Sequence, residues 1–491
     1  MQKILVRLFY AGFALLWGWI FLNSVLRWQH NSLAALGLGL VLVGGLYAVA
    51  RWLLPRLNSL SRKQWKAGFF ALFTVYAALF CRLSWLLAEI PIMDHEAILK
   101  SLPDLLQNGH FTVWSGYYIV CNNNLGTALV LGLWYKLFSL FGFGPGLDLM
   151  GVMPGIVLND IAILGSVALV CLLARRIFSS NRAVALAFIL CVGFAPFLLY
   201  SPFFYSDTLS LPFALLCLLG FNSLHRAKTV KKQALCLVGM GAAAFFGFAV
   251  KGSVAVMLVA VVIQLFLEYK PKKALAFALV MVLCFGGLVG GYKLLQRSYM
   301  IDWADEEMLT LPITLWFCYG SHDDGNYSQA DVDAVMAVDT IAQREEIIAQ
   351  RIRDNYASYT PGQLFRFMTR KAAITWGNGM YDAQEFLETP QRSSWTHFFT
   401  VPGQPGFMPV VYYCQAVLYA VQLLVLLFLA GQIKQANANT LTLAGIGVLG
   451  LVIFLSFWET KARYAFHFTP LLLLLALGGL LWLCKENPRE T

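Results

Sequence analysis

Residues 66–100 read KAGFFALFTVYAALFCRLSWLLAEIPIMDHEAILK, and this stretch decides the fold class. It is hydrophobic from Lys66 to Leu87 with a single arginine inside, which is about the 20 residues that a helix needs to cross a bilayer. Asp94, His95 and Glu96 then stand side by side where this helix should leave the membrane. Ionisable side chains in or beside a membrane span are costly, so these three residues form a candidate functional site.

The rest of the chain has the same character. Of its 491 residues, 59% are hydrophobic and only 13% are charged, which is too few charges for a soluble surface. We therefore predict an all-α polytopic membrane protein with about 12 transmembrane helices. They are expected at 4–26, 33–54, 66–89, 151–175, 183–201, 207–225, 234–250, 252–268, 273–296, 409–431, 438–458 and 464–484.

Lysine and arginine in short loops indicate the orientation, because such loops stay on the cytoplasmic side. Four loops are basic, around residues 56–66, 175–182, 226–232 and 270–273, and both ends of the chain carry basic residues as well. With twelve spans, all four basic loops and both basic termini lie on the same side of the membrane, which is then the cytoplasmic side. The segment that carries Asp94 is then extracytoplasmic.

One further apolar segment, LGTALVLGLWYKLFSLFGF at 125–143, could cross as a thirteenth span. A crossing there would move every later basic loop to the outside. We therefore favour an interfacial helix with Lys136 reaching toward water.

The chain divides into three regions. We expect a transmembrane region at 1–296, with a first external loop at 90–150 that carries the candidate functional residues, and C-terminal transmembrane helices at 409–491. Residues 297–408 hold 15 of the 26 acidic residues and predict a mainly α external soluble domain. Within it, Ala330 to Tyr356 has the apolar spacing of a helix.

Ionisable residues collect on the predicted external face. Beside Asp94, His95 and Glu96 they are Asp207, Lys251, Glu459, Lys461 and Arg463. Three of them have a structural alternative: Asp94 as a solvated helix-end acid, Asp207 as a helix N-cap, and Lys251 as the mark of a helix end. Asp160, inside a predicted span, is read as packing between helices rather than as a catalyst.

A carboxylate beside fixed cations suits one chemical task. The cations can hold an anionic lipid head group while the carboxylate takes a proton from an acceptor. Arginine grips a phosphate in a bidentate manner, and lysine serves it as a point charge.

Several motifs resemble the GT-C superfamily of integral membrane glycosyltransferases. The resemblance is to the branch of protein O-mannosyltransferases and aminoarabinose transferases, which use polyprenyl-phosphate sugars, and to a Gram-positive-type subgroup. It rests on MDHEAI (93–98), YYIVCNNNLGTALVLGLWYKLF (117–138), YSDTLSLP (205–212), FGFAVKGS (246–253), LPITLWFCYGSHDDGNYSQADV (311–332), ITWGNGMYDAQEF (374–386) and FWETKARYAFHFTP (457–470). Two extra N-terminal helices, and the absence of a proline before the interfacial helix, depart from the family's pattern.

The resemblance implies roles residue by residue. Asp94 would be the catalytic base, Glu96 a neighbouring carboxylate for sugar or metal, and Asp207 a residue that positions the acceptor or a lysine. Lys251 and Arg463 would bind the donor phosphate, with Tyr464 beside them. Glu459 and His95 are further candidates for substrate contact.

The implied activity is inverting transfer of a sugar from a polyprenyl-phosphate donor lipid to an acceptor hydroxyl at the cell membrane. The acceptor is a glycan, teichoic acid, lipid or protein; no nucleic-acid partner is expected. A divalent cation is left open, because His95 and Glu96 are not spaced for one helix face, and the loop at His322 to Asp324 suits a solvated turn better than an ion site. The competing classes are a transporter or flippase for lipid-linked saccharides and a non-catalytic assembly factor.

Overall fold

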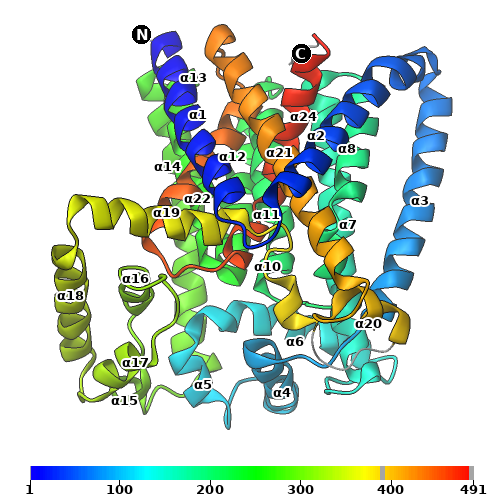
Figure 1. Cartoon of the computed structure of the whole chain (residues 1–491). Coiled ribbons are helices and arrows are strands. Elements are labelled where there is room, and N and C mark those ends of the chain that lie inside the picture. Colours follow the sequence, from blue (N-terminus) through cyan, green and yellow to red (C-terminus); the bar gives the residue numbers. More distant parts are fainter. Residues whose placement is uncertain (1, 388–392, 486–491) are drawn as a thin grey trace.

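The computed structural model describes residues 2–387 and 393–485, and every regular element in these ranges is a helix (Figure 1). Nine helical segments in this part of the chain are long and apolar enough to span a membrane. The protein is therefore an all-α, multi-pass membrane protein. The nine segments are α1 (Gln2–Leu26), Ser32–Trp52 with α2 (Ser32–Ala48), α3 (Arg62–Leu86), α7 (Leu149–Phe178), Ser206–His225 with α10 (Ser206–Leu209) and α11 (Leu211–His225), α12 (Val230–Val250), Pro271–Met300 with α14 (Pro271–Leu295), α21 (Phe407–Gln435) and α22 (Thr440–Phe457).

Three further apolar helices are shorter. They are α8 (Asn181–Gly193), the segment Gly252–Glu268 with α13 (Val256–Glu268), and α24 (Thr469–Leu483). They stand where the other three predicted spans were expected. The helix positions thus agree with the sequence, whereas the number of helices that cross the membrane stays a prediction.

The helices differ strongly in burial. α24 is enclosed from Thr469 to Leu481, and α21 packs beside it while also contacting α1 and α2. In contrast, α3 and α14 turn many apolar side chains outward, among them Phe70 and Leu283. Such large exposed apolar side chains suit contact with lipid, so α21 and α24 belong to the centre of the bundle and α3 and α14 to its periphery.

The two ends of the bundle carry different parts of the chain. In Figure 1 the N and C labels lie together at the top. The opposite end carries α4 (Met93–Asn108), α5 (Ser115–Val120), α6 (Leu125–Ser139), α15 (Glu306–Leu309), α17 (Gln329–Met336) and α20 (Ser394–Thr400). Both termini therefore lie away from Asp94, as expected; which side of the membrane each end faces stays a prediction.

Three predicted helices are shorter than expected or divided, each beside a proline. The helix expected at 183–201 ends at Gly193 before Pro196, the one at 207–225 is divided at Ser210 before Pro212, and the one at 464–484 begins at Thr469 before Pro470. Proline lacks an amide hydrogen and clashes with the preceding helical turn, so it favours a helix start over a helix interior. These interruptions leave irregular backbone at the end of the bundle that carries α4.

The segment expected to lie in the interface forms α6, which ends earlier than predicted. At 15 residues it is shorter than the roughly 20 that cross a bilayer, and Lys136 is exposed. It lies against α12, where a Cβ on Gly126 would come within 1.7 Å of the Ala249 carbonyl oxygen. Only glycine allows this approach.

Residues 297–408 contain short helices with a small core of their own. The described elements after residue 305 are α15 (Glu306–Leu309), α16 (Leu315–Tyr319), α17 (Gln329–Met336), α18 (Ile341–Ser358), α19 (Pro361–Gly377), a 3-10 turn (Ala383–Phe386) and α20 (Ser394–Thr400). The core is made by Leu315, Cys318, Tyr319, Val335 and Ile348. The periodic stretch from Ala330 to Tyr356 is two helices rather than one, because Thr340 caps the start of α18. The boundaries of this region stay a prediction.

Candidate functional site

The Asp94 carboxylate is held by three side chains from distant segments. It accepts hydrogen bonds from the hydroxyls of Tyr117 (3.0 Å) and Tyr205 (3.3 Å). Asn124 joins these two tyrosines, because its amide donates to Tyr117 at 2.8 Å and accepts from Tyr205 at 2.6 Å. Met93, just before Asp94, has a positive φ of 53°. The carboxylate therefore has a determined orientation, unlike a freely solvated helix-end acid.

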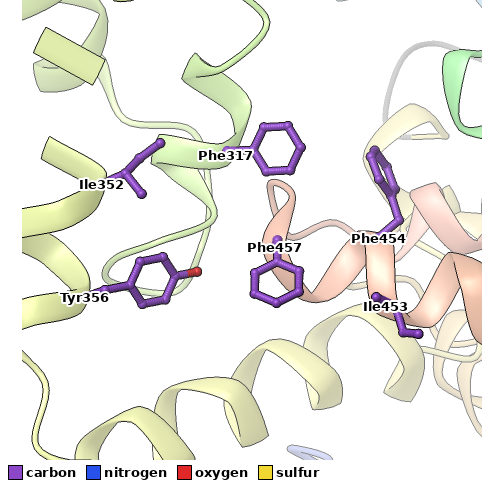
Figure 2. A pocket seen from close by; sticks show the side chains of 6 residues that line it. All are labelled: Phe317, Ile352, Tyr356, Ile453, Phe454 and Phe457. Atoms are coloured by element: carbon purple, nitrogen blue, oxygen red, sulfur yellow. The ribbon is translucent and has the colours of Figure 1, made fainter. Parts of the chain in front are cut away.

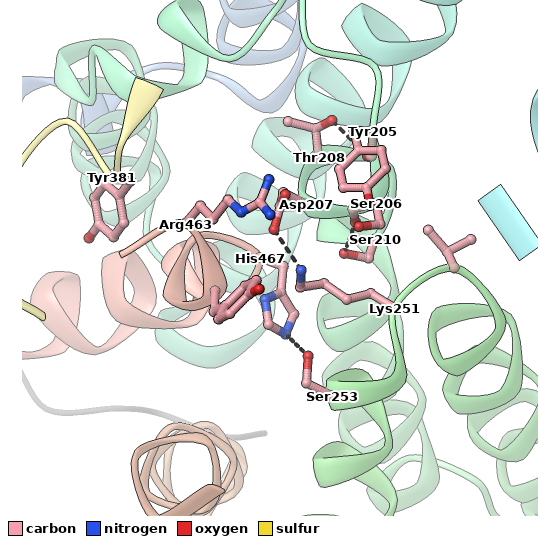
Figure 3. A network of polar contacts seen from close by, with 12 residues as sticks. Tyr205, Ser206, Asp207, Thr208, Ser210, Lys251, Ser253, Tyr381, Arg463 and His467 are labelled. Atoms are coloured by element: carbon pink, nitrogen blue, oxygen red, sulfur yellow. Dashed lines mark hydrogen bonds and ion pairs between the residues drawn. The ribbon is translucent and has the colours of Figure 1, made fainter. Parts of the chain in front are cut away.

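A buried ion pair begins two residues after Tyr205, at Asp207. Asp207, whose side chain is fully buried, accepts a 2.6 Å hydrogen bond from Lys251 Nζ (Figure 3). The N-cap residue of α10 is Tyr205, and Asp207 lies in its first turn, so Asp207 serves the ion pair rather than the cap. Lys251 does end α12, as its structural alternative expected, and it also takes part in this pair.

Arg463 approaches the same pair from the far end of the chain. Figure 3 shows its guanidinium beside Asp207. The guanidinium carbon lies 5.4 Å from the ring centre of Tyr464, and Lys251 Nζ lies 5.1 Å from the same ring. Arg463 begins the short helix α23 (Arg463–Phe466). Two cations thus share one aromatic wall, an arrangement that favours an anion between them.

Two buried polar atoms in this cluster lack a hydrogen-bond partner among the described residues. They are Arg463 Nε and Asp207 Oδ2. Buried polar groups are nearly always paired, so such orphans call for an explanation. A ligand oxygen at the guanidinium would satisfy the first.

Tyr205 connects the Asp94 carboxylate with the ion pair of Asp207 and Lys251. Its hydroxyl contacts Asp94, while Asp207, two residues further on, contacts Lys251. A second tie links the two cationic segments, because His467 Nε2 lies 3.0 Å from Ser253 Oγ. One carboxylate with a fixed orientation and two cations therefore stand in a single constellation.

Glu459 lies behind this constellation. It is buried and accepts a 2.6 Å hydrogen bond from the Tyr464 hydroxyl. The geometry favours a role in orienting the tyrosine that faces the cations.

The structure separates the three adjacent titratable residues at the start of α4. His95 is buried between the rings of Phe203 and Phe204, with ring centres 5.0 and 4.1 Å away, and burial lowers its pKa to about 3. Glu96 forms a partly exposed ion pair with Lys100 at 2.5 Å. Of the three, Asp94 alone is bonded to Tyr205 in the described contacts. The roles assigned to His95 and Glu96 remain hypotheses without added support.

Several residues of the site escaped the sequence analysis. Tyr117, Asn124 and Tyr205 hold Asp94, and Asp382 accepts hydrogen bonds from the backbone at Arg463. Their types are common in loops, so their spacing carried no signal. Asp160, read as packing between helices, is buried in α7.

One group of side chains in the described part of the chain has metal-ligand types close together. Ligand atoms of Cys318, His322 and Asp331 lie within 4.8 Å of one another. The guanidinium of Arg351, however, already lies 2.7 Å from Asp331, and His322 bridges Asp331 and Asp323. The Arg351 guanidinium therefore already supplies the positive charge beside Asp331. We regard the group as an ion-pair network that ties α16, α17 and α18 together. The turn is more structured than the solvated loop expected from sequence.

Two cavities lie beside residues 297–408. An apolar one of about 380 Å³ is lined by Phe317, Ile352, Tyr356, Ile453, Phe454 and Phe457, between α16, α18 and α22 (Figure 2). A more polar one of about 580 Å³ lies at the turn after α1 and includes Trp28, Arg370 and Asp382 in its lining. The second cavity therefore borders the segment that supports Arg463.

Comparison with known proteins places the chain in a family. A family model described as "conserved hypothetical integral membrane protein" matches residues 58–480. The chain belongs to this family. The match to this integral membrane family includes Asp94, Asp207, Lys251 and Arg463, and begins after the first two helices. No curated protein matches the sequence.

Two solved structures are distantly similar to this member of the integral membrane family. One is the archaeal oligosaccharyltransferase AglB from Archaeoglobus fulgidus, in complex with an inhibitory peptide and a dolichol-phosphate, with a TM-score of 0.43 and 14% identity. The match covers 84% of this chain and 50% of AglB, so the chain spans about half of that protein's length. The other is ArnT from Cupriavidus metallidurans bound to undecaprenyl phosphate, with a TM-score of 0.37 and 13% identity over 84% of this chain and 78% of ArnT.

Proposed function

We propose that the protein is an inverting glycosyltransferase that moves a sugar from a polyprenyl-phosphate donor to an acceptor hydroxyl. The observation that carries the proposal is the constellation of one oriented carboxylate, Asp94, with two cations, Lys251 and Arg463, at one end of a membrane bundle. The GT-C-like order of the sequence motifs supports the same reading.

In this mechanism Asp94 acts as general base. It takes the proton from the acceptor hydroxyl as the hydroxyl oxygen attacks the anomeric carbon. The bond between that carbon and the phosphate oxygen breaks, and the electron pair leaves with the polyprenyl phosphate. Attack from the face opposite the leaving group inverts the anomeric centre, and a single base without a covalent nucleophile suffices.

The cations serve the leaving group. Negative charge grows on the phosphate as the bond breaks, and Lys251 and Arg463 would stabilise it in a site where much of the water is excluded. Tyr464 lies beside both cations, with its ring centre 5.1 Å from Lys251 Nζ and 5.4 Å from the Arg463 guanidinium carbon. Asp207 holds Lys251 in place.

The basic loops favour an extracytoplasmic site with both termini in the cytoplasm. A cysteine introduced at Lys231 should then resist a membrane-impermeant thiol reagent on whole cells, and one introduced at Asp333 should react. Native Cys318 is buried and would not report on the side of the membrane. The opposite labelling pattern would overturn the orientation.

The function can be tested with purified protein in proteoliposomes. The substrates are a panel of radiolabelled polyprenyl-phosphate sugars, with an envelope extract as the acceptor. We expect label to move from lipid to acceptor, with release of polyprenyl phosphate. Movement of a fluorescent lipid-linked sugar across the bilayer without any transfer would instead favour a flippase, and neither activity with any donor would favour an assembly factor.

Tyr205→Phe should lower turnover about tenfold while donor-lipid affinity changes little. The single hydroxyl proton of Tyr205 is shared between Asn124 Oδ1 at 2.6 Å and Asp94 Oδ2 at 3.3 Å, so its removal loosens both contacts around the base, and a hydrogen bond to a charged group contributes on the order of 1.5 kcal/mol. The loss should appear in kcat because Tyr205 orients the base. Steady-state kinetics in the transfer assay measure it.

A matched control is Tyr118→Phe. Tyr118 lies in the same helix as Tyr117, and its hydroxyl bonds with Ser101 instead of Asp94. Its removal should leave turnover near wild type. Equal losses in both variants would contradict a specific role for Tyr205.

A further inference from the structure

We propose that Asp382 is a positioning residue that sets Arg463 in its phosphate-binding place. The inference rests on the proposed function, because it assumes that Arg463 binds the donor phosphate. It concerns a segment, residues 378–386, that we call the strap. The strap follows α19 and includes the 3-10 turn Ala383–Phe386.

The strap reaches the Arg463 segment through one carboxylate. Asp382 is 8% exposed, and its Oδ2 accepts hydrogen bonds from the backbone amides of Ala462 (2.8 Å) and Arg463 (3.3 Å). Its Oδ1 accepts a third from the Asn378 side chain at 2.7 Å. A carboxylate with three donors fixes the backbone from which the Arg463 side chain departs.

The backbone of the strap is strained at this point. Tyr381 and Asp382 are successive residues with positive φ angles of 55° and 63°. Such a conformation costs a non-glycine residue on the order of 1 kcal/mol or more and persists only where the surroundings enforce it. The Tyr200 hydroxyl donates to the Tyr381 carbonyl, and the Tyr381 ring packs against Phe466 of α23.

The other end of the strap is fastened to the centre of the bundle. Gln415 of α21 accepts from the Gly379 amide at 2.8 Å and donates to the Gly377 carbonyl at 2.9 Å. A Cβ on Gly379 would lie 2.5 Å from the Cys414 backbone, so the approach requires glycine. The position of the strap is therefore determined by α21.

The strap also contacts the Arg463 side chain directly. The guanidinium carbon lies 5.7 Å from the ring centre of Phe386, and Phe386 stacks on Phe203 with ring centres 3.9 Å apart. Asp382 thus orients the Arg463 backbone while Phe386 supports its guanidinium. Both act before any ligand arrives, which reduces the entropy lost on binding.

The test compares the dissociation constants for undecaprenyl phosphate of Asp382→Gly, Arg463→Ala and the double variant in nanodiscs. Glycine accepts the positive φ without strain, so Asp382→Gly removes the carboxylate without forcing the backbone into another conformation. Arg463→Ala should weaken binding about 10- to 100-fold, as expected for loss of a charge-assisted contact. Asp382→Gly should weaken it about tenfold, and the double variant should bind no more weakly than Arg463→Ala.

Asp382→Asn provides the conservative variant. Asparagine tolerates a positive φ and keeps an oxygen that can accept from the backbone, so it should retain affinity within about threefold of wild type. Thermal unfolding of each variant reports folding separately. If Asp382→Gly does not fold, Asp382→Ala alone and in combination with Arg463→Ala carries the comparison: a loss in the single variant that disappears in the Arg463→Ala background supports the inference, and a loss that adds to the arginine loss, or no loss at all, overturns it.

The outcomes separate this inference from the proposed function. Unchanged affinity in Arg463→Ala would contradict the phosphate role on which both rest. A weakened Arg463→Ala with wild-type binding in Asp382→Gly would overturn only the positioning role. Fully additive losses would do the same, because Asp382 would then act independently of Arg463.

Discussion

Asp94→Asn is expected to abolish sugar transfer, with turnover falling about 100- to 10,000-fold. The amide has the size of the carboxylate, and its single oxygen can still accept from one of the two tyrosines, Tyr117 or Tyr205, yet it cannot take a proton from the acceptor. General base catalysis typically contributes a factor of this size. Turnover is measured by transfer of radiolabelled sugar in proteoliposomes, at equal amounts of folded protein.

The affinity for undecaprenyl phosphate should not change in this variant, because the cations are untouched. Asp104→Asn is the matched control, since Asp104 lies in the same helix but bonds with Asn108 at the end of that helix and with Thr112 in the following turn. It should transfer sugar at nearly the wild-type rate. Wild-type turnover in Asp94→Asn would refute the assignment of the base.

Lys251→Met is expected to lower the free energy of unfolding by about 3 kcal/mol and to abolish donor use. Breaking a buried ion pair by removing one partner typically costs about 3–5 kcal/mol, because the remaining charge is left unpaired. Here that charge is the fully buried Asp207 carboxylate. We expect the lower end of the range because Arg463 lies beside Asp207 (Figure 3).

A double variant separates stability from function. Asp207→Asn together with Lys251→Met removes both charges, so most of the lost stability should return. Transfer should stay low, because one cation is missing at the phosphate. Chemical unfolding and the transfer assay are run in parallel. A Lys251→Met protein as stable as wild type, or an active double variant, would contradict the argument.

The positions of most helices could be predicted from the sequence. Runs of about 20 apolar residues have few alternatives to membrane helices, since each backbone amide must be satisfied internally in lipid. The errors fell at Pro196, Pro212 and Pro470, where a missing amide hydrogen ends or divides a helix. The break at Thr340 escaped because apolar spacing continues across it.

The candidate site could be predicted only in part. Asp207, Lys251 and Arg463 were found because charges near membrane spans are rare. Tyr117, Asn124, Tyr205 and Asp382 were not, because their roles arise from contacts across 23 to 111 positions in the chain, such as the one between Tyr205 and Asp94. Polar residues of these types occur in any loop, and a single sequence does not show which of them meet.

The stretch at 94–96 shows where the division lies. The sequence by itself determined that a hydrophobic helix ends there and that three titratable side chains follow it. Successive residues of a helix point about 100° apart, so the three side chains had to face different surroundings. Only the tertiary structure decided which surroundings these were, because the aromatic rings around His95 and the tyrosines around Asp94 come from segments far away in the chain.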